Sequence, residues 1–407
     1  MKRGTKLLYK KIFAGLLGGG MLFMPNWSYA LPSGGQVVTN NGTITAGGKV
    51  MDITGSGNVA IDWNSFNIAA DEIVNFKNMQ AVLNYVSGGS KSEIFGKLNG
   101  AGVNVFLVNP NGILFGKTAQ VNVGQLTAST RSLEKAALNS FNGSLSPLDA
   151  GGAANVKADI INLGKLKAGK LVLEGNNLSI IGSDSLEVAD KSKITLRAGE
   201  NINIGYEVTD KTTIDVGDGK GNTHQVSDYG KGGGDKASDV LSTASVTDLK
   251  GSAKSINDAM LVHDVYELQA IDRNTGTING SSYVVGNYML AGDIDAGDTK
   301  NWNSGRGFDP IGRLNRTGNG VTGSFSGAFD GICHRIKNHN IRQIGNQYDG
   351  YIGLFEGIGK GGSVGNVNMA GGHIEGTSNF GSIAGLNWGT IYNIVNSAEL
   401  VCSSGGV

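Results

Sequence analysis

Residues 171–204 read LVLEGNNLSIIGSDSLEVADKSKITLRAGENINI, and five short apolar segments begin within them, seven or eight residues apart. In each segment two apolar residues stand two positions apart, which places both side chains on one face of a β-strand. These pairs are Leu171/Leu173, Leu178/Ile180, Leu186/Val188, Ile194/Leu196 and Ile202/Ile204. Two or three such strands make one coil of about 20 residues in a β-solenoid. Antiparallel sandwiches also have period-two strands, but the near-equal spacing favours an all-β parallel β-helix.

The composition of the whole chain is also typical of many short strands joined by tight turns. Glycine accounts for 66 of the 407 residues, more than twice its roughly 7% average share, and it is interleaved with Val, Ile, Leu and Asn. The formal net charge is zero, and charged residues make up only 17% of the chain. The chain therefore has no strong field of either sign, which argues against nucleic acid or an anionic membrane surface as its partner.

The first 30 residues read as an export signal rather than as part of the fold. Basic residues between positions 2 and 11 are followed by the apolar run 12–24 and then by Ser28-Tyr29-Ala30, a small-x-small cleavage site that ends at Ala30. The apolar run has 13 residues, fewer than the roughly 20 that a membrane-spanning helix needs. The sequence therefore predicts a secreted protein without a transmembrane span.

Residues 103–116, VNVFLVNPNGILFG, contain a turn between two apolar strands. Within Asn109-Pro110-Asn111-Gly112, proline stands at position i+1 of a type I turn and glycine at i+3, positions that these residues favour. The two asparagines either cap the turn by bonding to the local backbone or stack with neighbouring coils as an amide ladder. The sequence leaves both roles open.

Other segments interrupt the strand pattern. Residues 131–141, RSLEKAALNSF, predict a short helix with Ser132 as its N-cap, placed outside the solenoid or at its edge. Residues 210–255 lack apolar periodicity and predict a linker or a long surface excursion. Asp264 predicts the N-cap of a second short helix. Residues 403–407 enter a further glycine-rich strand without a polar cap, which indicates a piece of a longer exoprotein.

Three segments resemble the N-terminal secretion domain of the filamentous haemagglutinin family, the exoproteins of two-partner secretion. They are LPSGGQVVTNNGTIT at 31–45, AIDWNSFNIAADEIVNF at 60–76 and SEIFGKLNGAGVNVFLVNPNGILFGKTAQVNVGQLTAST at 92–130. The order of these segments and the turn at 109–112 coincide with the family pattern over about residues 31–165. The family's second motif, of the Asn-Pro-Asn-Leu kind, has no match here. Residues 264–407 resemble the glycine-rich repeats of bacterial surface adhesins and of some immunoglobulin-cleaving proteases.

The resemblance implies a right-handed parallel β-helix, which an outer-membrane β-barrel transporter with periplasmic POTRA domains recognises and exports. It also implies that Asn109, Pro110, Asn111 and Gly112 act in recognition or in nucleating the fold. The expected protein is a non-enzymatic exoprotein, secreted or held at the cell surface, whose remainder is an adhesin-like stalk for an unknown ligand. The expected organisation is an export signal at 1–30, a secretion domain at 31–165, β-helix repeats at 166–209, a linker or excursion at 210–260 and glycine-rich solenoid repeats at 261–407.

Two other functions stay open from the sequence. Asp293 and Asp295 would share one face of a strand, where paired carboxylates could bind calcium or serve a β-helical carbohydrate-active enzyme or protease. The chain could also be the delivery stalk of a toxin whose C-terminal part lies beyond residue 407. The sequence has no catalytic motif and no standard metal-ligand spacing, so it predicts no catalytic residue, no cofactor and no metal site. Cys333 and Cys402 are expected to be buried apolar residues rather than a disulfide.

Overall fold

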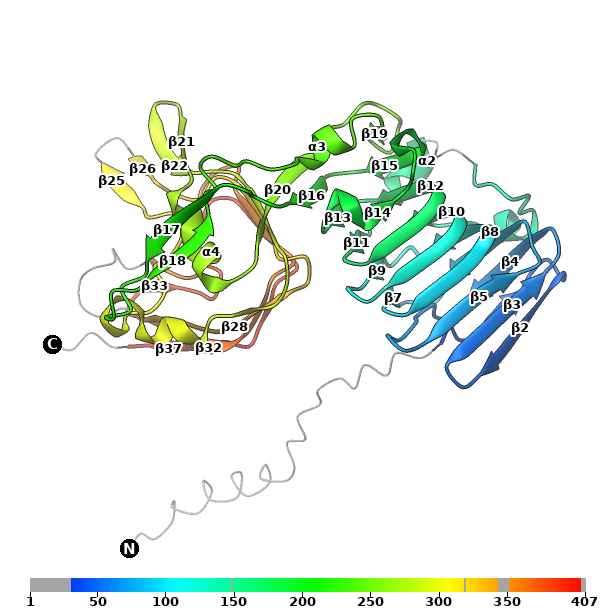
Figure 1. The fold of residues 1–407 in the computed structure, drawn as a ribbon, viewed down its shortest axis with the longest axis horizontal. Coiled ribbons are helices and arrows are strands. Elements are labelled where there is room, and N and C mark those ends of the chain that lie inside the picture. Colours follow the sequence, from blue (N-terminus) through cyan, green and yellow to red (C-terminus); the bar gives the residue numbers. More distant parts are fainter. Residues whose placement is uncertain (1–30, 147, 149, 318–319, 343–350, 404–407) are drawn as a thin grey trace, which may run out of the picture.

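The fold is seen in a computed structural model that describes residues 31–146, 148, 150–317, 320–342 and 351–403. Figure 1 shows two stacks of strands joined by a green segment. We call residues 31–206 the first solenoid, residues 207–256 the connecting segment and residues 257–403 the second solenoid. The predicted export signal, its cleavage site at Ala30 and the end of the predicted last strand, residues 404–407, lie outside the described residues.

The first solenoid is built on a large sheet whose strands come from successive coils. Leu171 pairs with Ile194 and Ala81 pairs with Asn104, in each case 23 residues later and in parallel. The antiparallel pairs of this sheet lie at its N-terminal end, where residues 36–37 pair with 61–62 and residues 42–47 pair with 50–55. The parallel pairing confirms the β-helix and excludes the antiparallel sandwich. Its strands are β1 (Gln36–Val37), β2 (Gly42–Gly47), β3 (Val50–Gly55), β4 (Asn58–Trp63), β5 (Ile73–Lys77), β6 (Ala81–Val86), β8 (Lys97–Val108), β10 (Gln120–Ser129), β12 (Lys165–Gly175), β14 (Leu186–Glu187) and β15 (Ile194–Ala198), and β19 (Ser245–Thr247) of the connecting segment pairs with β15 at the edge.

A second sheet runs through both solenoids and links them into one continuous path. Its strands pair in parallel from the first coil to the last, and β16 of the first solenoid pairs with β20 of the second. We call it the long sheet. Its strands are β7 (Ser92–Ile94), β9 (Ile113–Phe115), β11 (Ile160–Asn162), β13 (Leu178–Ile180), β16 (Ile202–Tyr206), β20 (Asn257–Val262), β23 (Asn287–Leu290), β27 (Ala328–Asp330), β31 (Ser363–Gly365) and β35 (Thr390–Tyr392).

The remaining strands complete the second solenoid or form hairpins outside it (Figure 1). The parallel strands are β24 (Ile294–Asp295), β28 (Arg335–Arg342), β29 (Tyr351–Ile352), β30 (Phe355–Ile358), β32 (Asn368–Gly376), β33 (Asn379–Phe380), β34 (Ala384–Asn387), β36 (Val395–Asn396) and β37 (Glu399–Cys402). The antiparallel hairpins are β17 (Lys211–Asp215) with β18 (Thr223–Ser227), β21 (Thr275–Ile278) with β22 (Ser281–Val284), and β25 (Asn315–Thr317) with β26 (Gly320–Thr322).

The helices are short, as predicted, but the described residues contain four rather than the expected one or two, because α2 and α3 were not predicted. They are α1 (Lys135–Asn139), α2 (Ala150–Ala154), α3 (Ala237–Val240) and α4 (Val265–Ala270), with 3-10 turns at Ser183–Ser185, Lys191–Lys193, Ile271–Arg273 and Gly297–Gly305. Asp264 caps α4 as predicted, because its carboxylate accepts hydrogen bonds from the backbone N–H groups of Tyr266 and Glu267. No helix in the described part of the chain combines the length and apolar character that a membrane crossing requires.

The predicted start of the first helix is wrong. Helix α1 begins at Lys135, and Glu134 rather than Ser132 is its N-cap residue. Arg131 is buried and bonded to Glu174 in the sheet, so the chain leaves the solenoid in an extended conformation before it turns helical. The predicted position is confirmed, because Leu138 packs against outward-facing apolar residues of the sheet, outside the core.

The two cores lie inside the coils and follow the alternation seen in the sequence. The inward pairs that begin at Leu171, Leu178 and Ile194 are completely buried. Full burial of one such side chain contributes about 1.5–3 kcal/mol, so each added coil is stabilised by the coil before it. A second core fills the second solenoid, and its share of aromatic side chains is larger.

The connecting segment is an ordered excursion that closes the facing ends of both cores. Ala237 and Leu241, at helix α3, pack into the first core. Ile214 and Val226, on the β17–β18 hairpin, pack into the second core. Because the segment contributes to both cores, we infer that each solenoid is capped where the chain passes from one to the other.

The prediction that both cysteines are buried is wrong. Cys333 and Cys402 are exposed and free. Cys333 has a φ of +66° in the tight turn that follows β27, where its neighbour Ile332 takes the buried position instead. Cys402 ends β37, a strand of mostly exposed residues.

Candidate functional site

The turn at Asn109–Gly112 joins β8 to β9 and has the predicted form. The backbone N–H of Gly112 donates to the carbonyl of Asn109 at 3.1 Å, which closes the turn. Gly112 has a φ of +110°, and a Cβ at this position would lie 3.2 Å from the carbonyl oxygen of Asp159. Glycine therefore suits this position both in conformation and in space.

Asn109 holds the turn against the preceding coil. Its side chain is completely buried. Its Nδ2 donates to the Ser90 carbonyl and to Ser92 Oγ, both at 3.0 Å, and its Oδ1 accepts from the Asn111 backbone N–H at 2.9 Å. Removing this amide would leave buried partners unsatisfied, which costs about 1–3 kcal/mol for such a group.

Asn111 has a different position, at the surface. Its side chain is exposed, and its Nδ2 donates to the Gly88 carbonyl at 2.7 Å. Gly88 packs so closely on the backbone of Asn64 that a Cβ would lie 1.9 Å from the Asn64 carbonyl oxygen. The turn and the 88–92 segment therefore form one hydrogen-bonded surface, and Pro110 and Asn111 are its accessible residues.

The two asparagines cap the turn, and no amide ladder includes them among the hydrogen bonds of the described residues. Amide ladders occur elsewhere in the first solenoid. Asn99 donates to Asn75, which donates to Asp52. A second ladder runs from Asn201 through Asn177 to Asp159. Each ladder ends on a carboxylate, which accepts the last amide hydrogens in a charge-assisted bond.

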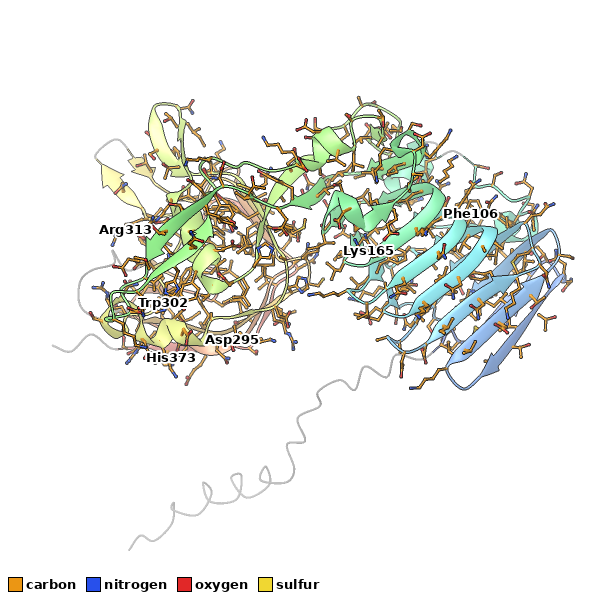
Figure 2. The ribbon with its side chains drawn as sticks, viewed as in Figure 1. Phe106, Lys165, Asp295, Trp302, Arg313 and His373 are labelled. Atoms are coloured by element: carbon orange, nitrogen blue, oxygen red, sulfur yellow. The ribbon has the colours of Figure 1, made fainter. Side chains whose placement is uncertain are left out.

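Asp293 and Asp295 share the outward face of β24 and its flank, but they do not form a paired-carboxylate site. Asp293 accepts hydrogen bonds from Arg335 and is within 3.0 Å of Lys337 Nζ. Burial alone would raise the pKa of Asp293, but the bonds from Arg335 and Lys337 hold it well below its usual range. Asp295 lies on the outside of the second solenoid (Figure 2), where it bonds to Asn338. Among the described residues, no group of three His, Cys, Asp or Glu side chains is arranged to hold a metal ion.

A buried glutamate in the second solenoid collects several polar groups that the sequence analysis did not connect. Glu267 accepts hydrogen bonds from Ser227 Oγ at 2.7 Å and from the His263 backbone N–H, and its Oε2 lies 2.9 Å from His263 Nδ1. Burial would raise the pKa of Glu267, but the bonds from His263 and Ser227 lower it to about 2. The bond to Glu267 is the main reason why the pKa of His263 rises to about 9.

This Glu267 cluster is structural rather than catalytic in its geometry. Ser227 donates to a carboxylate instead of to a histidine, so the contact between nucleophile and base that serine catalysis needs is missing. Ser227 lies on β18 and Glu267 on α4, so the cluster fastens the capping hairpin to the second core. The spacing of four residues between His263 and Glu267 was the available sequence signal, but on its own it indicates only a possible ion pair.

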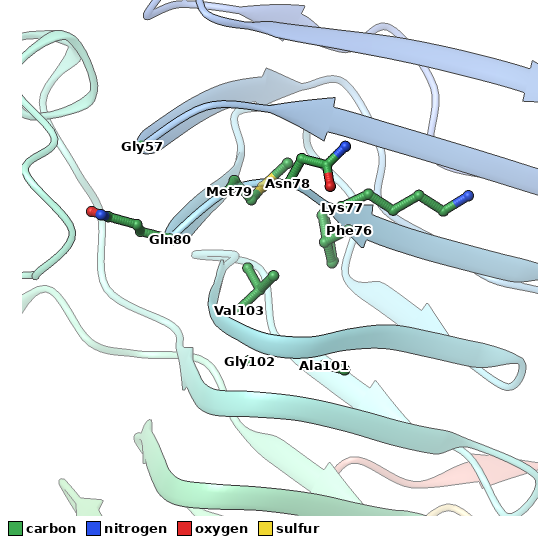
Figure 3. Close-up of a pocket in the computed structure, with 9 residues that line it drawn as sticks. All are labelled: Gly57, Phe76, Lys77, Asn78, Met79, Gln80, Ala101, Gly102 and Val103. Atoms are coloured by element: carbon green, nitrogen blue, oxygen red, sulfur yellow. The ribbon is translucent and has the colours of Figure 1, made fainter.

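A groove of about 600 Å³ opens on the first solenoid between β5 and β8 (Figure 3). Phe76, Met79 and Val103 supply its apolar lining, and Lys77 stands at its edge. Lys77 is the one titratable side chain among its lining residues, so the groove does not bring an acid and a base together.

The chain was compared with known proteins. A family model described as the TPS secretion domain matches residues 28–294, which extends past the boundary at residue 165 that the motifs indicated. Halomucin of Haloquadratum walsbyi is 27% identical over 282 residues, 69% of this chain and 3% of halomucin. A heme/hemopexin-binding protein of Haemophilus influenzae is 33% identical over 177 residues, 42% of this chain and 19% of that protein.

Among solved structures, the HMW1 secretion domain of Haemophilus influenzae aligns with 91% of this chain and 98% of its own, with 15% identity and a TM-score of 0.35. The matched regions cover a small share of both curated relatives, 3% and 19% of their lengths.

Proposed function

The chain belongs to the family of TPS secretion domains, and on that premise we propose that an outer-membrane two-partner-secretion transporter recognises its first solenoid through the turn at 109–112. The transporter's periplasmic POTRA domains are the proposed binding partner. The observation that carries this proposal is the geometry of Asn109, whose buried amide fixes the turn to the 88–92 segment. Pro110 and Asn111 are thereby presented on a rigid surface, as a binding site requires.

We further propose that the exported protein is secreted or stays at the cell surface and that its second solenoid is a non-enzymatic, adhesin-like stalk. The ion-paired state of Asp293 supports this over the enzyme alternative. The heme/hemopexin-binding relative matches over only 19% of its length, so its ligand is not transferred to this chain.

Secretion of the full chain tests the recognition site. Asn111→Ala removes an exposed side chain and should strongly reduce the amount released through a two-partner-secretion transporter. Asn201→Ala is the matched control, because Asn201 is also an exposed turn asparagine of the first solenoid but lies far from the turn in sequence. Thermal unfolding of both variants shows whether each is folded.

Asn109→Ala separates folding from recognition. We expect it to lower both the unfolding temperature and secretion, because its partners Ser90 and Ser92 are left unsatisfied. Equal secretion of Asn111→Ala and Asn201→Ala, with both folded, would reject the turn as the recognition site.

A further inference from the structure

The large sheet of the first solenoid has an open edge at its N-terminal end. Strand β2 (Gly42–Gly47) pairs along its whole length with β3, and it pairs with no other strand of the described residues. Figure 1 shows it at the outer margin of the blue strands. The free edge of such a strand presents a row of backbone N–H and C=O groups, which is a template for pairing with another chain.

Half of the backbone groups of β2 face this open edge. A two-residue turn joins β2 to β3, and Gly48, its first residue, has a φ of +59°. Such a turn makes the flanking residues Gly47 and Val50 a hydrogen-bonded pair, and bonded and non-bonded pairs alternate along an antiparallel ladder. Ala46 and Ile44 therefore direct their N–H and C=O groups away from β3, and no other described segment bonds to these groups.

The edge lacks the features by which proteins usually protect such strands. Charged side chains, proline and bulges commonly prevent an edge strand from pairing with another chain. Residues 33–48, SGGQVVTNNGTITAGG, contain no charged residue and no proline, and β2 pairs with β3 in unbroken register, without a bulge. Thr43 and Thr45 are exposed, and a Cβ on Gly47 would contact nothing within 4 Å. The edge is therefore accessible to a second strand.

The chemistry of the edge favours a second copy of this chain as the partner. Two β2 strands that run antiparallel about a two-fold axis present matching donors and acceptors to each other. No like charges meet, because β2 is uncharged and Lys49, just beyond its end, is paired with Asp71. With Ile44 opposite Ile44 of the second copy, Thr43 lies opposite Thr45, and threonine pairs across strands are favourable.

We propose that β2 is a self-association edge, through which two copies of this chain join their large sheets by antiparallel strand pairing. The joined sheet runs from β3 of one copy through both β2 strands to β3 of the second. Self-association through β2 does not require the recognition function proposed for the turn at 109–112, which joins other strands.

The geometry also limits the strength of the association. Each copy contributes one strand of six residues, and such a pairing covers much less surface than the roughly 1,200–2,000 Å² of a stable interface. We therefore expect reversible dimers that form at high protein concentration, or where many copies are held close together on one surface.

Sedimentation velocity of the purified full chain over a concentration series is the first measurement. The wild type should dimerise reversibly as its concentration rises. Thr43→Lys places a charge on both edges and should weaken dimerisation about fivefold. Asn122→Lys is the matched control, because Asn122 is an exposed outward residue of the same sheet on the inner strand β10, and it should dimerise like the wild type. A wild type that stays monomeric at its highest soluble concentration would overturn the self-association.

Mixing two charged variants identifies the surface. Thr43→Lys and Thr43→Glu should each be mainly monomeric, because like charges on facing strands repel. An equimolar mixture should form mixed dimers at least as readily as the wild type, since opposite charges then meet across the two-fold axis. Dimers that persist in both variants and show no preference in the mixture would mean that another surface joins the copies.

Ala46→Pro tests the contribution of the backbone. Proline removes an N–H that faces the open edge and no bond to β3, so this variant should fold, as read by circular dichroism, and dimerise less than the wild type. A monomeric wild type, together with a Thr43→Lys variant that loses binding to the transporter's purified periplasmic region, would assign the edge to the transporter and reject self-association.

Discussion

The first and second solenoids stack their coils in the same way but differ in coil length. In the first, partner residues on neighbouring coils are commonly 23 apart, as with Lys97 and Gln120. In the second, residues 287, 328, 363 and 390 follow one another in the long sheet at separations of 41, 35 and 27. Parallel stacking therefore depends on the short inward-facing strands, and the loops between them are free to vary.

The two cores differ in chemistry in a way that fits this difference in coil length. Aliphatic side chains dominate the first core. In the second, Phe355 packs against Phe325 and Phe329, with ring centroids 4.8 and 5.7 Å apart. Large aromatic rings therefore fill much of the second core, whereas stacked Leu, Ile and Val fill most of the first.

The largest expected effect tests whether the two cores are separate units. Phe355→Ala removes a completely buried ring and should cost about 3–5 kcal/mol, and Leu173→Ala, its counterpart in the first core, about 2–5 kcal/mol. Because each core is capped, amide hydrogen exchange should rise mainly in the solenoid that carries the change. A rise in both solenoids for either variant would mean that the two cores unfold as one.

The next effect concerns the insertion between β10 and β11 in the first solenoid, which carries α1 and α2. Arg131 and Glu174 form a buried, bidentate ion pair that holds the start of this insertion to the sheet. Arg131→Ala should cost about 3 kcal/mol in denaturant unfolding, since it leaves Glu174 buried with Arg197 as a weaker partner. Arg197→Ala is the control, with an expected loss of about 1 kcal/mol or less because Arg197 is partly exposed. Equal losses for both variants would contradict this assignment.

A smaller effect tests the cap of the second core. Asp264→Ala removes the carboxylate that accepts two backbone hydrogen bonds at the start of α4, and should cost about 1 kcal/mol. Asp264→Asn keeps an N-cap acceptor and should retain most of the stability. The exchange rates of amides in α4 are the measurement. An Asn variant as weak as the Ala variant would show that the charge, rather than the hydrogen bonds, stabilises the helix.

The last prediction compares how the stability of each solenoid responds to acid, and its effect at neutral pH is the smallest of the four. His339 is completely buried in the second solenoid beside Phe308, and burial lowers its pKa from 6.5 to about 3. The unfolded chain therefore binds a proton at His339 between pH 6.5 and pH 3 that the folded chain does not, so stability falls as the pH drops through this range. His339→Leu should remove this part of the acid sensitivity and change little at pH 8.

The first solenoid is the internal control for that prediction. The sequence contains no histidine between residues 31 and 206. Unfolding followed separately in each solenoid by hydrogen exchange should therefore show the histidine-dependent loss in the second solenoid only. An identical pH profile for the wild type and His339→Leu would contradict the assignment.

Much of the local structure could be read from the chain. Four of the five predicted strand starts, from Leu178 to Ile202, are the observed first residues of β13, β14, β15 and β16, and the fifth, Leu171, lies inside β12. They were predictable because alternation of apolar residues is a local property of a β-strand. The turn at 109–112 and the Asp264 cap were also predictable, since proline, glycine and aspartate act on backbone groups within a few residues. The start of α1 was not, because Arg131 is held by Glu174, 43 residues away.

The contact between the two solenoids left no recognisable mark in the sequence. Ser179 and Asn203 stand at outward positions, where polar residues are ordinary, and their partner Asp330 is more than 100 residues away. The buried state of Glu267 was equally hidden, since its donor Ser227 lies on a hairpin in a segment without apolar periodicity. Both depend on residues that are distant in the sequence and meet only in the folded molecule.

Short-range order in this protein, namely its strands, its turn and its helix caps, follows from the amino-acid sequence alone, because each depends on the periodicity or conformational preference of adjacent residues. The path of the long sheet is a property of the folded molecule. Along this path Asp330 of the second solenoid accepts a hydrogen bond from Ser179 of the first, 151 residues away, and the outward residues Glu93 and Leu114 of the first solenoid are buried. Such contacts form between distant residues, whose energies depend on three-dimensional fit rather than on any local pattern.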